Sequence, residues 1–122
     1  MDAEWISLAA HEVGCNFCLA IELGKNNVYE IELTQDNLLE FDSKISTSDY
    51  IIVPTNRYFI LMRVRGSHFI IAGPKQFVRK SIGCSFQTAR EMFEIYADDP
   101  EPPERKELLR EVAKRYEPFC RD

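Results

Sequence analysis

Residues 50–72 read YIIVPTNRYFILMRVRGSHFIIA, and this segment carries the strongest indication of the fold. Three runs in it are rich in β-branched and aromatic residues: 50–53, 57–65 and 68–72. Such runs suit the pleated, half-buried surface of a sheet, and the short turns at Pro54 and Gly66 join strands that lie side by side. The segment therefore predicts three consecutive strands of an antiparallel meander.

Two more strands are expected before this segment. Residues 17–23 are mostly apolar, and residues 28–33 alternate apolar and charged side chains with a period of two. The turn chemistry of Gly-Lys-Asn-Asn between them predicts a β-hairpin, which brings the sheet to five strands. Residues 34–48 are ambiguous, because Thr34 could cap a short helical turn while the residues from Asp42 onward are typical of a loop.

Helices are expected on both sides of the strands. The first begins after the capping residue Asp2 and ends at Gly14, with an apolar stripe at Trp5, Leu8, Ala9 and Val13. Three more are expected within residues 74–83, 85–97 and 104–117. Ser85 is expected to cap the second of these three, and Met92 to lie on its apolar stripe. This order predicts one α+β domain over residues 1–122: an N-terminal helix, a five-stranded, meander-like antiparallel sheet, and three C-terminal helices packed on one face.

The composition bounds the class of protein. The chain has 122 residues, 45% of them hydrophobic, and a formal net charge of −5. A chain of this size buries about two thirds of its unfolded surface, so it can form a core without disulfides, and its four cysteines are expected to be reduced. No apolar run is long enough to cross a membrane and the first residues lack signal-peptide features, so a cytoplasmic protein with no membrane contact is expected.

The charges are segregated along the chain. Residues 1–43 hold nine acids and one base, residues 44–90 eight bases and one acid, and residues 91–122 ten acids and six bases. Such blocks can form binding surfaces, or they can neutralise each other on one folded surface. The second explanation predicts that Glu30 and Glu32 of one strand meet the arginines at 63 and 65 of another on the solvent face of the sheet.

The absence of catalytic motifs favours an interaction protein over an enzyme. We expect a small acidic module that binds, inhibits or regulates another protein, with acidic residues facing a basic partner. The expected partner-binding residues are Glu30, Glu32, Asp36, Glu40, Asp42, Asp98, Asp99 and Glu101. A second copy of the chain could also bind, through an open sheet edge or through the last helix. Nucleic acid is not an expected partner, because the protein is acidic.

The alternative is a ligand-sensing or enzymatic domain. In that case an anionic small molecule would lie in a pocket near the basic middle strands. The residues that would bind the anion are Arg57, Arg63, Arg65, Arg79 and Lys80.

Motifs for cofactors and metals are incomplete. No glycine pattern matches a nucleotide-binding loop, no serine lies in a nucleophile elbow, and the residues that follow His11 lack the second histidine of a zinc protease. No cofactor and no catalytic residue are therefore expected. Cys15 and Cys18 have a spacing that could hold zinc together with His11, but their place at the start of a strand favours buried core cysteines.

Overall fold

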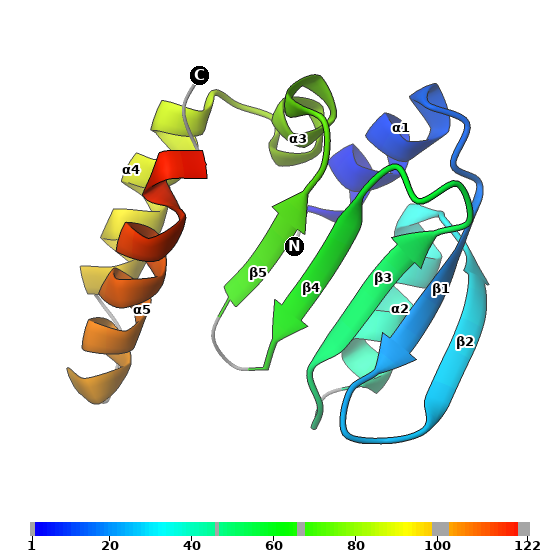
Figure 1. The fold of residues 1–122 in the computed structure, drawn as a ribbon, viewed down its shortest axis with the longest axis horizontal. Helices are drawn as coiled ribbons and strands as arrows, with labels where there is room; N and C mark the ends of the chain where they lie inside the picture. Colours follow the sequence, from blue (N-terminus) through cyan, green and yellow to red (C-terminus); the bar gives the residue numbers. More distant parts are fainter. Residues whose placement is uncertain (1, 46, 66–67, 99–102, 120–122) are drawn as a thin grey trace. The chain divides into compact units, whose positions relative to one another are not determined.

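The chain has the α+β architecture predicted from its sequence. The computed structural model describes residues 2–45, 47–65, 68–98 and 103–119. The elements follow in the order α1 (Ala3–Glu12), β1 (Phe17–Glu22), β2 (Asn27–Glu32), α2 (Gln35–Lys44), β3 (Tyr50–Pro54), β4 (Ile60–Val64), β5 (His68–Ala72), α3 (Lys75–Ile82), α4 (Phe86–Asp98) and α5 (Pro103–Tyr116) (Figure 1). Contacts within the chain form two compact units, Met1–Ile82 and Gly83–Asp122.

The first unit contains a five-stranded sheet in which all neighbouring strands are antiparallel. Its order is β2-β1-β3-β4-β5, so a hairpin and a meander join where β1 pairs with β3. Helix α2 connects β2 to β3 across the sheet, and β2 is left at one edge. The predicted strands are confirmed, although β4 is shorter than the predicted run and begins at Ile60.

The core lies between one face of the sheet and helices α1, α2 and α3 (Figure 1). Alternate residues of the three central strands point into it and are almost fully buried: Cys18, Ala20, Tyr50, Ile52 and Leu61. The helices contribute Ile6, Leu38, Phe41 and Phe77, among others. Successive side chains of a strand point to opposite faces of the sheet, so only every second residue faces the helices. The register of strand pairing therefore determines which side chains contact α2.

Helix α2 is longer than the sequence indicated. Thr34 caps it as expected, since its hydroxyl accepts a hydrogen bond from the Asn37 N–H at 3.1 Å. The helix does not stop after a single turn but runs to Lys44, so the prediction of a loop from Asp42 onward is wrong for its first residues. Leu38, Phe41 and the C-cap residue Ile45 are buried at helical spacing, and this packing outweighs the polar composition.

Helix α1 begins and ends where the sequence predicts but buries a different face. The Asp2 carboxylate accepts a hydrogen bond from the Trp5 N–H, and Gly14 has a φ of +77° just past the helix end. The predicted stripe is wrong at Trp5 and Leu8, which are about half exposed. The buried face is instead formed by Ala3, Ile6, Ala9 and Ala10, and the small side chains of the three alanines allow close packing.

The second unit is a pair of helices with a 3₁₀ turn. Ser85 caps α4, as predicted, by accepting a hydrogen bond from the Thr88 N–H at 3.1 Å. The buried side chains of this unit are Phe86, Ala97, Leu109 and Val112. Met92, predicted to lie on the buried stripe of α4, is instead 62% exposed. Among the described residues, no helix has the length and apolar character that crossing a membrane requires.

Adjacent leucines of α2 provide a test of this packing. Leu38 is fully buried whereas Leu39 is 46% exposed. We expect Leu38→Ala to lower the free energy of unfolding by about 2–5 kcal/mol, because it leaves a cavity in the core. Leu39→Ala, the matched control, should change it by about 0.5 kcal/mol or less. Urea unfolding followed by circular dichroism measures both, and equal losses would contradict the assigned face of α2.

Candidate functional site

Four of the predicted partner-binding acids lie around one edge of the sheet. Glu30 and Glu32 are on β2, Asp36 and Glu40 are on α2, and all four are exposed. A shallow hollow opens between this strand and this helix, and its lining includes three of the four acids: Tyr29, Glu30, Ile31, Glu32, Asn37, Glu40, Phe41, Lys44 and Ile45. Tyr29, Ile31, Phe41 and Ile45 make the hollow largely apolar, while Glu30 and Glu32 pass along it through the strand and point their side chains to the opposite face of the sheet.

The other predicted acids do not belong to this group. Asp42 accepts hydrogen bonds from Arg63 and Tyr50 inside the first unit. Asp98 belongs to the second unit, where Arg110 and Lys106 pair with it and hold the pKa of its carboxyl below the usual range. Asp99 and Glu101 lie outside the described residues. The apolar residues of the hollow were missed in the sequence, because the helix that carries Phe41 and Lys44 was not recognised at its full length.

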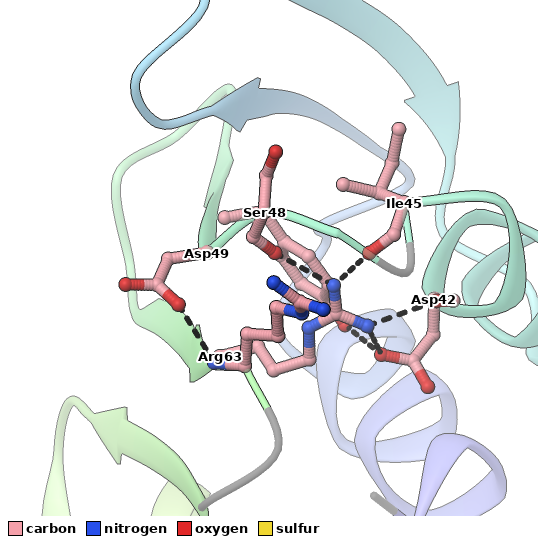
Figure 2. A network of polar contacts seen from close by, with 7 residues as sticks. Asp42, Ile45, Ser48, Asp49 and Arg63 are labelled. Carbon is pink, nitrogen blue, oxygen red and sulfur yellow. Dashed lines mark hydrogen bonds and ion pairs between the residues drawn. The ribbon is translucent and has the colours of Figure 1, made fainter.

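The end of α2 is held by a buried arginine. Arg63 projects from β4 toward the last turn of the helix (Figure 2). One terminal nitrogen donates to the carbonyl and to the carboxylate of Asp42, at 2.9 and 3.0 Å. The other donates to the carbonyls of Ile45 and Ser48, the latter at 2.7 Å. A guanidinium with these partners satisfies carbonyls that the end of a helix leaves without intrahelical donors.

Tyr50 completes this network from the neighbouring strand. Its hydroxyl donates to the Asp42 carboxylate at 2.7 Å, and the Arg63 guanidinium lies 4.5 Å from the centre of its ring. Burial, together with the hydrogen bond to Asp42, raises the pKa of Tyr50 far above its ordinary value of 10.0. The positive charge also lies at the negative end of the α2 dipole. These contacts fix the helical wall of the hollow.

Arg63 of β4 does not meet the glutamates of β2. Arg63 pairs in register with Tyr50 on the covered face, whereas Glu30 and Glu32 point to the opposite face. Two further strands, β1 and β3, separate β2 from β4. The expectation that acids and bases neutralise each other across one solvent face is therefore wrong for this pair of strands.

The residues of the anion-binding alternative are dispersed. Arg63 is buried in its internal network, and Lys80 of α3 forms an ion pair with Glu12 of α1. Arg57 precedes β4 in a turn, where its φ is +58°, and Arg65 follows β4. The length of that strand, about 3.3 Å per residue, separates these two arginines. Arg79 is exposed on α3. An anion pocket built from these residues stays a prediction.

The potential zinc ligands each have a separate contact. The Cys15 thiol donates to the Asn56 side-chain oxygen at 2.9 Å, and the His11 Nε2 lies 2.7 Å from the Leu33 carbonyl oxygen. Cys18 is fully buried in the core, and its burial raises the pKa of the thiol to about 12. Within the described part of the chain, no three histidine, cysteine or acidic side chains are grouped as metal ligands.

The face of the sheet opposite α1, α2 and α3 is also apolar. Four of its side chains expose between 41 and 60% of their surface: Phe17, Leu19, Val28 and Ile60. Glu30 and Glu32 lie on this face beside Leu19 and Phe17, their partners in register on β1. The acids at the sheet edge thus have apolar neighbours and no base directly opposite.

Comparisons with known proteins identify no relative. No protein-family model, no curated protein and no solved structure matches this chain.

The Arg63 network predicts a large effect of a single substitution. Arg63→Ala leaves the Asp42 carboxylate without its cation and the carbonyls of Asp42, Ile45 and Ser48 without this donor, and we expect the free energy of unfolding to fall by about 3–5 kcal/mol. Arg65→Ala removes an exposed side chain on the same segment and should change stability by about 0.5 kcal/mol or less. Urea unfolding of the two variants measures this difference. Similar stabilities would show that Arg63 does not hold the end of α2.

The buried hydroxyl and thiol predict a loss of stability at alkaline pH. The pKa of Cys18 is raised from 9.0 by burial and by the nearby Cys15, and that of Tyr50 is raised from 10.0. Both groups ionise more readily when unfolded, so their contribution is complete below the unfolded pKa and is lost as the pH rises toward the folded one. We expect the free energy of unfolding to decrease from pH 9 to pH 11, as measured by urea titration.

Cysteine substitutions distinguish the contribution of the Cys18 thiol to this pH dependence from the contributions of other groups. Cys18→Ala should reduce the decrease in stability between pH 9 and pH 10, because it removes the thiol that resists ionisation. Cys84→Ala is the matched control, since Cys84 is a free and only partly buried cysteine. The same pH dependence in Cys18→Ala as in the unmodified chain would contradict the assigned role of this thiol.

Proposed function

We propose that this protein is a non-catalytic interaction module that binds a basic protein partner at the β2–α2 edge of its sheet. The observation that carries the proposal is the gathering of four exposed acids, Glu30 and Glu32 on β2 and Asp36 and Glu40 on α2, at the edge strand of the sheet. Lys44 is the only base among the residues that line it. Complementary charge of this kind steers partners together and selects among them.

The four acids are available for a partner. No described residue forms an ion pair with any of them, in contrast to Asp42, Asp98 and Glu12. Exposed acids of one sign attract a basic surface over about 10 Å at moderate ionic strength, and salt weakens this attraction. We further propose that the module acts in the cytoplasm, where Cys15, Cys18 and Cys84 stay reduced.

A charge-reversal experiment tests this function. The protein is immobilised, and proteins captured from an extract of its own cells are identified by mass spectrometry at increasing salt. We expect a basic partner that is lost as salt rises, and at least about tenfold less of it on Glu30→Lys/Glu32→Lys.

A charge-matched variant controls for the change in net charge. Glu107→Lys/Glu111→Lys reverses two exposed acids of α5 in the second unit and should capture the same partner as the unmodified chain. Equal loss in both variants, or no loss in either, would refute binding at the β2–α2 edge.

A further inference from the structure

We propose that the partner binds as an extended segment that adds a sixth strand to the sheet along β2. This inference rests on the proposed function and specifies the form of the partner at the same site. Side chains on one face of the added strand are basic and meet Glu30 and Glu32, and those on the other face are apolar and enter the hollow beside α2. Three features of the edge carry the inference.

The first feature is the free backbone of β2. Strand β2 pairs with β1 only, and no other described strand lies along it. The Leu33 N–H donates to the Asn16 carbonyl at 2.8 Å, in the same register as the hairpin. Hydrogen-bonded pairs alternate in antiparallel strands, so Tyr29 and Ile31 bond to β1. The peptide groups of Val28 and Glu30, together with the Glu32 N–H, therefore face outward and can pair with another strand.

The second feature is the pocket that the added side chains would enter. Tyr29 and Ile31 point from β2 toward α2, and Phe41 and Ile45 of the helix line the same hollow. A strand laid beside β2 points every second side chain into this space, because side chains alternate between the two faces. Backbone pairing then supplies affinity and the hollow supplies specificity for apolar residues, as in other cases of strand addition.

The third feature is the charge on the opposite face. Glu30 and Glu32 occupy alternate positions, so both would stand directly beside residues of the added strand on its outer face. Lysine or arginine at those positions forms favourable cross-strand pairs. A second copy of β2 would instead place acid against acid, and like charges directly opposite are destabilising. The edge therefore favours a basic segment over the chain's own β2.

Backbone-methylated peptides test the strand geometry directly. The probe is Lys-Val-Lys-Val-Lys-Val-Lys, titrated at low salt into the nitrogen-15-labelled full chain. We expect the amide resonances of Val28, Glu30 and Glu32 to shift most. N-methylation of one alternating set of residues should weaken binding at least about tenfold, because it removes the donors that face β2, while methylation of the other set is tolerated.

The position of the harmful methyl groups also shows whether the peptide runs antiparallel or parallel to β2. Loss confined to the lysine set corresponds to antiparallel addition with lysines beside the glutamates, and loss confined to the valine set to parallel addition; both support the inference. Binding that tolerates both sets, or is lost equally with both, overturns strand addition and leaves the proposed function in place. Absence of binding by this peptide, together with no salt-sensitive basic partner, would overturn both.

A proline on the edge strand gives an independent test. Val28→Pro removes an outward N–H without touching the hydrogen bonds to β1, a position where edge strands accept proline. We expect at least about tenfold weaker peptide binding than with Val28→Ala, the control for loss of the side chain, while circular dichroism confirms that both variants fold. Equal affinities overturn the inference. Light scattering tests the competing occupant, because a dimer that Val28→Pro dissociates would show that β2 binds a second copy.

Discussion

The placement of α2 depends on one buried cation. Arg63 binds the carbonyls of Asp42, Ile45 and Ser48 and the Asp42 carboxylate, so a side chain from β4 determines where the helix ends. Removing a guanidinium from water is costly, and the four acceptors bound by its two terminal nitrogens offset that cost. The helix is thereby held over β1, β2 and β3 at a fixed position (Figure 1). This placement of the helix over β2 forms the hollow at the sheet edge.

The open edge follows from the connection that α2 makes. The chain leaves β2, crosses the covered face as a helix, and enters β3 on the far side of β1. No later element of the meander returns to β2, since β4 and β5 extend the sheet in the other direction. A strand left in this position needs protection from non-specific pairing, and charged side chains provide it. In the function that we propose, Glu30 and Glu32 both oppose self-association and select a basic partner.

The sequence predicted what local chemistry determines and missed what tertiary contacts determine. Strands were recognised from β-branched runs, and helix ends from Asp2, Thr34 and Ser85, because each signal acts within a few residues. The full length of α2 was missed because Asp42 is typical of a loop in the sequence. Its contact with Arg63, which binds the end of the helix, exists only in the folded chain. The face of the sheet on which Arg63 lies could not be predicted from the sequence either. Both faces of β4 are apolar, with Leu61 on one and Ile60 on the other, so the hydrophobic periodicity does not indicate which face points to the core.

The segregation of charge along the chain acquires a structural meaning at the β2–α2 edge. Had bases of residues 44–90 faced Glu30 and Glu32, these two acids would be neutralised and the edge would be indifferent to charge. Instead Arg63 is turned inward to Asp42, and Lys80 pairs with Glu12 away from β2. Within the described part of the chain, no arginine or lysine forms an ion pair with Glu30 or Glu32. Because those acids alternate along a strand whose outward peptide groups pair with no described strand, charge and hydrogen bonding both favour the ligand that we propose, an extended basic segment.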